Sequence, residues 1–266
     1  MEKKVTIYDI AKAANVSAAT VSYVINNRTD QSISEETKNR IWHIINLLNY
    51  KPNVFAKNLR TSSDKKLIAV CAESISTLER AEVINFFEGL SKSFGKSCGL
   101  LFVTFPFERL DNADAIIAYN VSKETFYEIG NKNFVPLIAV NCIIDDPLFF
   151  QISANYKSLK QKADDYFANE EYHFVCLTPT DGLLKNEIQQ SFDNVIFVDN
   201  NTDLFSIDAK NILTTHTILA SFMQSRHANL LYVDLYGPIC GQVASCVQKA
   251  SSREPFDIHS YRVCVN

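Results

Sequence analysis

The stretch that decides the fold of the first part of the chain is residues 6–26, TIYDIAKAANVSAATVSYVIN. Thr6 is placed to cap a first helix, with Asp9 three residues on as a short-armed capping box. Ser17 is placed to cap a second helix, and Asn15 between them tolerates the positive φ of a tight turn. Apolar residues fall on one helical face of each segment: Ile7, Ile10, Ala11 and Ala14, then Val21, Val24 and Ile25. The stretch predicts a helix-turn-helix whose second helix reads a major groove.

The pattern T-I-x-D-I-A-x-x-A-x-V-S-x-x-T-V-S-x-V-I-N, present without a gap at residues 6–26, resembles the amino-terminal head of the LacI family. The likeness continues through SEETKNRIWHIINLLNY at 34–50, which resembles the third helix of that head. It then runs through PNVFAKNLR at 52–60, which resembles the hinge helix of the family. Three elements in order are far more specific than a bare helix-turn-helix pattern. The resemblance implies a helix-turn-helix DNA-binding head at 1–50 and a hinge helix with linker at 51–66.

The resemblance also implies which side chains meet DNA. The two positions after the second cap face base edges in the family, and here they are Ala18 and Ala19, whose methyl groups can pack on a thymine methyl. The alternative role of both alanines is simple helix propensity. Hydroxyl side chains on the same helix suit phosphate oxygens. The predicted set is Thr6, Ser17, Ala18, Ala19, Thr20, Ser22, Tyr23 and Asn26 in the head, with Asn53, Val54, Ala56, Lys57, Leu59 and Arg60 in the hinge.

Tyr23 departs from the family, because most relatives have an arginine there that grips guanine. A tyrosine has one hydroxyl and a flat ring, so the base preference at that step should differ. The alternative is that Tyr23 only packs.

The hinge segment is too short to be a stable helix alone. Val54, Ala56 and Leu59 share one face of it. The resemblance implies that two such helices, one per subunit, pair in the minor groove, with Leu59 wedged into the central base step and Ala56 packed across the dyad. Lys57 and Arg60 flank this wedge with charges that suit phosphates. The alternative is that Leu59 belongs to an ordinary core.

Charge is distributed unevenly along the chain. Residues 1–66 hold eleven Lys or Arg against six Asp or Glu, a balance of +5, so residues 67–266 carry −9 within the net charge of −4. A basic head on an acidic remainder brings one end to a polyanion while the other stays off it.

Composition excludes several other classes of protein. No apolar run approaches the roughly 20 residues that cross a bilayer, and seven scattered cysteines without a C-x-x-C pair suit a reducing cytoplasm. The chain has no G-x-G-x-x-G, no phosphate loop, no G-x-S-x-G elbow and no metal-ligand spacing among its five histidines. We therefore expect no enzyme, cofactor or metal, and a cytoplasmic, nucleoid-associated protein.

Beyond residue 66, short apolar runs alternate with amphipathic segments. The expected strands are 67–72, 100–105, 115–119, 136–141, 150–153, 173–178, 195–198, 230–234 and 261–265, and the expected helices are 81–94, 123–131, 157–168, 185–192 and 241–250. Such alternation implies parallel sheets covered on both faces. It resembles the effector domain of the family, two α/β lobes of periplasmic-binding-protein type with a cleft between them, here at 67–266. The segment LYVDLYGPICGQVA, residues 231–244, also resembles the strand-to-helix segment that precedes the closing strand in the family.

This domain departs from the family pattern at the cleft. It is shorter than usual, and residues 80–83 (RAEV) stand where an N-P-F-F ligand loop is usual. The segment that begins at Asp181 lacks the ligand-clamping arginine of the family. Asp199 or Asp203 could bind a sugar hydroxyl, although aspartates in such a run are more often turn residues.

Two functions remain open. In the first, a dimeric repressor binds a near-palindromic operator, and a small molecule in the cleft, a sugar or another metabolite, changes its affinity. In the second, the head binds DNA while the body only dimerises or docks a protein partner. Both need a twofold dimer, since symmetry matches palindromic half-sites.

Overall fold

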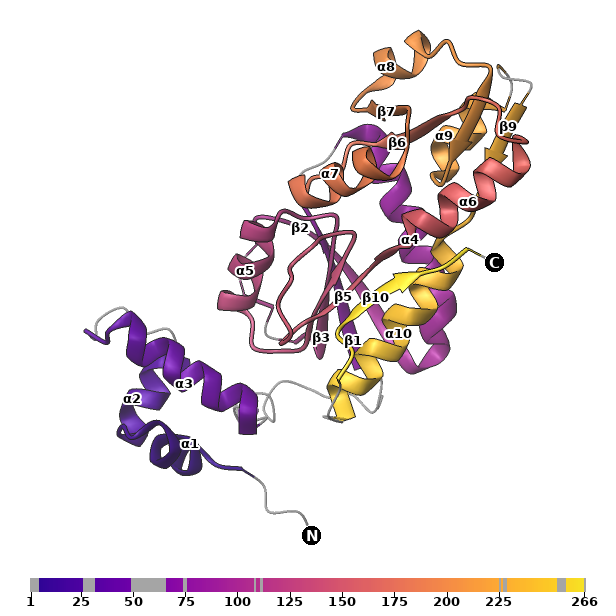
Figure 1. Cartoon of the computed structure of the whole chain (residues 1–266). Helices are drawn as coiled ribbons and strands as arrows, with labels where there is room; N and C mark the ends of the chain where they lie inside the picture. Colours follow the sequence, from indigo (N-terminus) through magenta and orange to yellow (C-terminus); the bar gives the residue numbers. More distant parts are fainter. Residues whose placement is uncertain are drawn as a thin grey trace. The chain divides into compact units, whose positions relative to one another are not determined.

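The computed structural model describes residues 5–25, 32–48, 66–73, 76–107, 109–110, 112–224, 226, 229–252 and 257–265. The chain divides into two compact units, Met1–Asp64 and Lys65–Asn266, each described here by itself (Figure 1). Asn26 and the predicted hinge residues 53–60 lie outside the described residues. Within these described ranges, no helix is long and apolar enough to span a bilayer.

The first unit, called the head below, contains three helices around a small core. They are α1 (Ile7–Ala14), α2 (Ala18–Ile25) and α3 (Glu35–Leu48). Ile10, Val21 and Ile41, one from each helix, are fully buried. Trp42 packs against this cluster from the side. The apolar faces expected for the two helices of the helix-turn-helix are thus confirmed, with Ile7 half-buried at the margin.

The second unit, called the body below, contains two all-parallel sheets. The first lobe has the strand order β10-β5-β4-β3-β1-β2 and the second lobe β7-β6-β8-β9. The strands of the first lobe are β1 (Lys66–Ala72), β2 (Cys98–Thr104), β3 (Ala115–Tyr119), β4 (Leu137–Val140), β5 (Phe150–Ala154) and β10 (Ser260–Val263), and its helices are α4 (Thr77–Phe94), α5 (Lys123–Lys132) and α10 (Tyr236–Ser252), with the 3-10 turn η2 (Gly95–Ser97).

Helices cover both faces of the first sheet, so alternate residues of each strand enter different cores. In β1, Ile68, Val70 and Ala72 pack on the side of α4 and α10. Ala69 and Cys71 pack on the side of α5. A doubly covered parallel sheet explains why these strands have near-continuous apolar sequences.

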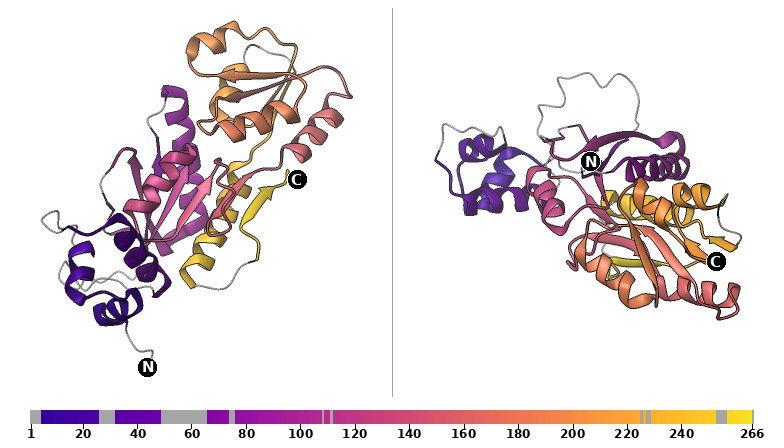
Figure 2. Two further views of the ribbon diagram at one scale, coloured as in Figure 1. Left: turned by 60° about the vertical axis from the view of Figure 1, so that its left-hand side comes forward. Right: turned by 90° about the horizontal axis from the view of Figure 1, so that it is seen from above.

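The second lobe repeats this arrangement on a smaller scale. Its strands are β6 (His173–Leu177), β7 (Val195–Val198), β8 (Asn211–Thr214) and β9 (Asn229–Tyr232), and its helices are α6 (Tyr156–Tyr166), α7 (Gly182–Ser191), α8 (Asn201–Ser206) and α9 (Thr217–Met223). Phe174 and Cys176 of β6 face α6 and α7, whereas Val175 and Leu177 face α8 and α9. The chain crosses between the lobes after β5 and again after β9 (Figures 1 and 2).

Helix α4 belongs to both lobes. Phe86 and Leu90 lie in the core of the first lobe, while Leu78, two turns earlier, lies in the core of the second. Helix α10 lies alongside α4 (Figures 1 and 2). The two helices approach closely at Gly89, where a Cβ atom would come within 2.8 Å of Cys240 Sγ.

The fold class expected from the sequence, a helix-turn-helix head and a two-lobed α/β body, is confirmed. Each expected strand and helix of the body has a counterpart, but β8, α8 and α9 were not expected. Helix α4 begins at Thr77 rather than near residue 81, because Ser76 and Glu79 form a capping box. Residues 80–83, expected at a ligand loop, are therefore helical.

Candidate nucleic-acid interface and inter-lobe cleft

Side chains fix the ends of the helix-turn-helix. The backbone N–H of Thr6 donates to Asp9 Oδ2 at 2.8 Å, and the Asp9 N–H donates to Thr6 Oγ1 at 3.4 Å, which closes the expected capping box. Asn15 follows α1 in the left-handed conformation, with φ 52 and ψ 48. Ser17 Oγ accepts the N–H of Thr20 at 3.0 Å and thereby caps α2. The turn therefore sets the direction of α2 through local contacts alone.

The exposed face of α2 includes Ala19 but only part of Ala18, although the sequence suggested that both face DNA bases. Ala19, Ser22 and Tyr23 share one side of the helix by their i, i+3 and i+4 spacing. Ala19 is exposed, and the other two are half-buried. Ala18 instead packs against the head core, because it precedes the fully buried Val21 by three positions. Of the two alanines expected at base edges, only Ala19 is fully available.

Three hydroxyls in the predicted DNA-contacting set also have partners within the head. Ser17 Oγ and Thr20 Oγ1 lie 2.8 Å apart, and Thr6 Oγ1 donates to Asp9 Oδ2 at 2.7 Å. Each hydroxyl oxygen retains a lone pair, so a cap does not prevent a further contact. The contacts expected of Asn26 and of the hinge fall on residues that the structure does not describe.

A cavity of about 60 Å³ lies in the cleft between the two lobes of the body. Since roughly 10–15 Å³ of such space takes one water, it has room for several waters. Polar lining comes from α4 (Glu79, Glu82), the ends of β3 and β4 (Tyr119, Asn120, Asn141), the β8–α9 turn (Thr215, His216), and Tyr156 and Tyr236. Asn120 and Asn141 adopt positive φ values of 48 and 53, which turns the chain sharply where each strand ends.

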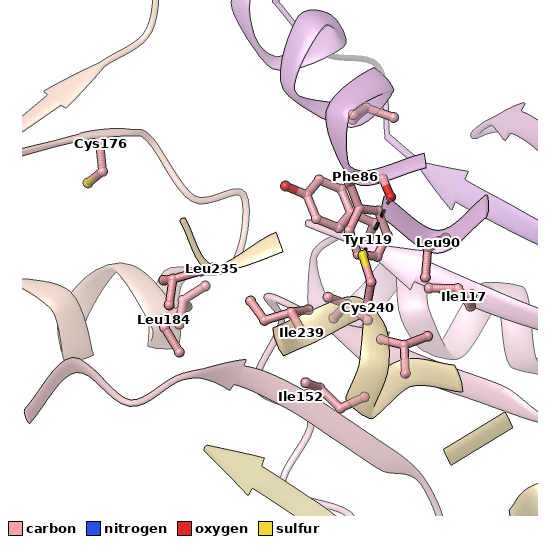
Figure 3. Close-up of a cluster of buried hydrophobic side chains, with 14 of the residues drawn as sticks. Phe86, Leu90, Ile117, Tyr119, Ile152, Cys176, Leu184, Leu235, Ile239 and Cys240 are labelled. Atoms are coloured by element: carbon pink, nitrogen blue, oxygen red, sulfur yellow. Dashed lines mark hydrogen bonds between the residues drawn. The ribbon is translucent and has the colours of Figure 1, made fainter. Parts of the chain in front are cut away.

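Apolar side chains make up most of the remaining wall. Cys176 and Leu184 of the second lobe face Leu235 and Ile239, which precede and begin α10 (Figure 3). All four belong to one apolar cluster that continues from the first lobe into the second. Packed apolar side chains therefore connect the two lobes beside the cavity.

Glu82 joins three elements at this cleft. Its carboxylate accepts the Tyr236 hydroxyl at 2.5 Å, the Ile218 N–H at 2.7 Å and Asn85 Nδ2 at 3.3 Å. The side chain is 1% exposed. Two further links join the lobes: Asn120 Oδ1 accepts the Thr180 N–H at 3.3 Å, and Asp181 Oδ1 accepts the Ile143 N–H at 3.4 Å.

Burial dominates the titration of the cleft tyrosines. It raises the pKa of Tyr119, Tyr156 and Tyr236 well above the ordinary value of a phenol. Tyr119 stacks on Phe86 with ring centroids 4.3 Å apart, and these two rings lie together beside α4 (Figure 3). The cleft thus presents neutral hydroxyls at ordinary pH.

His216 stands at the start of α9. The residue is partly buried, and its Nδ1 atom is buried without a hydrogen-bond partner among the described residues. Burial lowers the pKa of His216, and the nearby Glu82 opposes that shift. The side chain is therefore a neutral imidazole with one unsatisfied ring nitrogen at the cleft wall.

The two aspartates considered for sugar binding do not line the cavity. Asp203 accepts the N–H groups of Asp199 and Asn200 at 2.8 and 3.1 Å, which completes the capping box of α8. That run is a helix start rather than a turn or a ligand site. Asp181, expected to begin a helix, caps α7 through the Leu184 N–H at 2.7 Å.

Sequence reasoning missed Glu82 and Tyr236 as cleft residues. One signal was present, since Glu82 interrupts the row Leu78, Phe86 and Leu90 at helical spacing. A carboxylate in an apolar row marks a buried polar site. No group of three or more His, Cys, Asp or Glu side chains suited to a metal ion occurs in the part of the chain that the structure describes.

Comparisons with known proteins agree with these two regions. Residues 6–53 match the family described as bacterial regulatory proteins, lacI family. The probable HTH-type transcriptional repressor ExuR of Bacillus subtilis (strain 168) is 28% identical over 184 residues, which is 65% of this chain and 54% of that protein. The chain thus spans about half the length of this curated relative.

Solved structures show the fold of the whole chain. A Lac repressor bound to ONPG in its repressed state gives a TM-score of 0.53 at 13% identity, covering 99% of this chain and 98% of that one. A sugar ABC transporter protein from Yersinia enterocolitica subsp. enterocolitica 8081 gives 0.51 at 12% identity, covering 81% and 85%. At these identities the likeness establishes the two-lobed α/β fold alone.

Proposed function

Residues 6–53 are a LacI-family helix-turn-helix domain, and from this premise we propose that the chain is a transcriptional repressor that binds a near-palindromic operator as a homodimer. The observation that carries the proposal is the geometry of α2: capped by Ser17 and anchored by Val21, it leaves Ala19, Ser22 and Tyr23 on one side. Such a helix fits the major groove. The relative from Bacillus subtilis is likewise named as a transcriptional repressor, not as an enzyme.

We expect a dimer because of the small area that one head can bury on DNA. One helix-turn-helix buries too little surface for tight specific binding, and two related by a twofold axis match the two halves of a palindrome. Phosphate contacts from Thr6, Ser17, Thr20 and Ser22 would fix the register, with Asn26 beyond the end of α2. A DNA-binding repressor acts where the chromosome is, which places the protein in the cytoplasm.

The hinge supplies the sharpest test of operator recognition. If Leu59 wedges into the central base step, Leu59→Ala weakens operator binding by roughly 1–3 kcal/mol and leaves binding to random DNA nearly unchanged, because only the kinked complex uses the wedge. Asn53, Val54, Ala56, Lys57 and Arg60 would position this wedge. Titrations of both DNAs by fluorescence anisotropy measure the difference.

A matched control is Leu148→Ala, since Leu148 is 73% exposed in the body and its loss should change neither titration. Equal weakening on operator and random DNA by Leu59→Ala would contradict the wedge and make Leu59 a structural residue.

For the body we favour a small ligand in the inter-lobe cleft. The unpartnered Nδ1 of His216 supports a ligand, because buried polar atoms in folded proteins are almost always satisfied. The closed cavity of about 60 Å³ favours the second candidate, a body that only dimerises or docks a protein. A thermal-shift screen of metabolites separates the two, since a bound ligand raises the melting temperature of the body.

A further inference from the structure

The charges that line the cleft have one sign. Glu79 and Glu82, three residues apart on α4, are the only Asp, Glu, Lys or Arg side chains among the residues that line the cavity. Arg262 and Lys185 have partners outside this lining: Arg262 pairs with Glu187 at 2.8 Å, and Lys185 Nζ lies 4.9 Å from the centre of the Phe197 ring. The cavity therefore offers acceptors to a ligand and no cation.

The two carboxylates lack a cationic partner in the described part of the chain. Glu82 accepts three hydrogen bonds, all from neutral donors. Glu79 accepts the Ser76 N–H at 2.8 Å and Asn120 Nδ2 at 3.4 Å, both neutral. No Lys or Arg that the structure describes forms an ion pair with either of them. A buried carboxylate is usually paired with a cation, and Glu82, which is 1% exposed, has none here, while the half-buried Glu79 adds a second negative charge beside it.

His216 cannot supply that partner. It lies near enough to Glu82 to feel its charge, yet burial lowers its pKa and keeps the imidazole neutral. Its Nδ1 atom is instead an unsatisfied group at the cavity wall. Since His216 lines the cavity, this unsatisfied nitrogen points to a ligand independently of the carboxylates.

Beside the neutral hydroxyl and amide groups of the wall, much of the lining is apolar. Phe174, Cys176, Leu184 and Ile188 come from the second lobe, and Leu235 and Ile239 lie at the start of α10. Leu184 and Leu235 lie close together (Figure 3). A sugar presents hydroxyls around its whole ring and would leave many of them without partners against such a wall. A ligand that is mostly apolar and has one polar end fits both the apolar and the polar part of the lining.

We propose that the cleft binds a small organic amine, with its apolar body against Leu184 and Ile239 and its ammonium group facing Glu79 and Glu82. The ammonium group donates to the carboxylates and takes the place of the missing cation. This inference rests on the proposed function in one respect, that the cleft is the effector site. It adds that anions of the same size are excluded, because no cation lines the cavity.

Three probes of equal size but different charge test the proposal on the full chain. They are isobutylamine (cationic), isobutanol (neutral) and isobutyrate (anionic), each titrated by calorimetry at pH 7.5. We expect the amine to bind at least about tenfold more tightly than the alcohol, since a hydrogen bond to a charged group contributes roughly 1.5–3 kcal/mol. Isobutyrate should give no heat of binding.

Two matched variants locate the amine. Glu79→Gln keeps an acceptor for the Ser76 N–H, because Gln also serves in a capping box, yet it removes one charge from the cavity. It should weaken isobutylamine binding about tenfold and leave isobutanol unchanged. Glu88→Gln changes the same charge on an exposed part of α4 and should leave all three titrations as in the wild type.

Equal binding of the three probes, preference for isobutyrate, or no binding of any probe each overturns the proposal. The same preparation is titrated with operator DNA obtained by binding-site selection. If DNA binds and the amine does not, the ligand class is wrong while the repressor function stands. If the amine binds and no DNA is selected, the proposed function is wrong and the cleft site stands.

Discussion

The head and the body differ in where their polar groups lie: at the surface in the head, and in the interior in the body. In the head, Ser17, Ala19 and Thr20 lie around a core of apolar side chains and face outward. In the body, Glu82 and Tyr236 lie inside, hydrogen-bonded to each other at 2.5 Å between two lobes. The head thus has polar groups at its surface, whereas the body has polar groups around an internal cavity.

This difference also decides how each region responds to its surroundings. Exposed charges are screened by salt, while buried groups are not. Buried groups respond instead to packing and to protonation. Four experiments can separate the two regions on this basis.

Salt should have the largest effect, and only on the head. If Lys4, Lys51, Lys57 and Arg60 neutralise several phosphates per subunit, operator affinity falls by a factor on the order of a thousand between 50 and 200 mM salt. Ligand binding in the cleft should change much less over that range, because Glu82 is buried and Glu79 is half-buried. A flat salt response of the DNA affinity would remove the DNA-binding function.

A change in core packing should have the next largest effect, and only on the body. Gly89→Ala would place a Cβ atom 2.8 Å from Cys240 Sγ, so either the buried Cys240 side chain or the two helices must shift. We expect the body to lose about 1–3 kcal/mol of unfolding free energy, the usual effect of overpacking. Chemical denaturation monitored by fluorescence measures this loss.

The control is the double variant Gly89→Ala with Cys240→Ala, in which the added methyl group occupies the space of the removed sulfur. The double variant should be more stable than Gly89→Ala alone. If the double variant is no more stable than Gly89→Ala, the contact with Cys240 Sγ is not the reason that residue 89 is a glycine. DNA affinity measured on the folded protein should stay unchanged throughout.

Tyr23 sharpens the comparison at a single base step. Tyr23→Arg offers a bidentate fork to guanine and should shift the preferred half-site toward guanine at one position, by about 1–3 kcal/mol. Tyr23→Phe should cost less than about 1.5 kcal/mol if the ring packs, and more if the hydroxyl is paired with DNA. Binding-site selection with both variants gives the result, and identical sites from Tyr23→Arg and the wild type would show that residue 23 reads no base.

Protonation of His216 should have the smallest effect, and only on the body. Burial lowers its pKa in the folded state, whereas the unfolded chain has the ordinary value near 6.5. The unfolded state therefore binds the proton more readily, so this contribution to stability is complete above about pH 6.5 and is lost as the pH falls below it. His216→Gln should lose less stability than the wild type between pH 6.5 and 5, and equal losses would show that His216 is accessible to protons.

The head could be predicted because its signals are contiguous. Thr6, Asp9, Asn15 and Ser17 each act on backbone groups within three or four residues, so their spacing in the sequence is their geometry. The half-buried position of Ala18 comes from packing against a core that all three helices form, which sequence spacing on α2 alone does not reveal.

The cleft could not be predicted in the same way. Glu82 meets Tyr236 across 154 positions of sequence and the Ile218 N–H across 136, so no local pattern records either contact. The missed elements have a different cause. The apolar run of β8 is only Ile212 and Leu213, and α8 has six residues, too few in each case for a periodic pattern to stand out from the polar residues around it.

Helix α4 affects the apparent affinity of any ligand that binds in the body. The second lobe holds the start of this helix through Leu78, which lies in its core, and through the Ile218 N–H, which donates to Glu82. Loss of these two contacts costs a few kcal/mol, and separation of the lobes would also break the apolar cluster that both lobes share. A ligand that enters only molecules with separated lobes binds with an apparent affinity reduced by the fraction of such molecules. Leu78, which does not line the cavity, therefore contributes to the affinity of such a ligand.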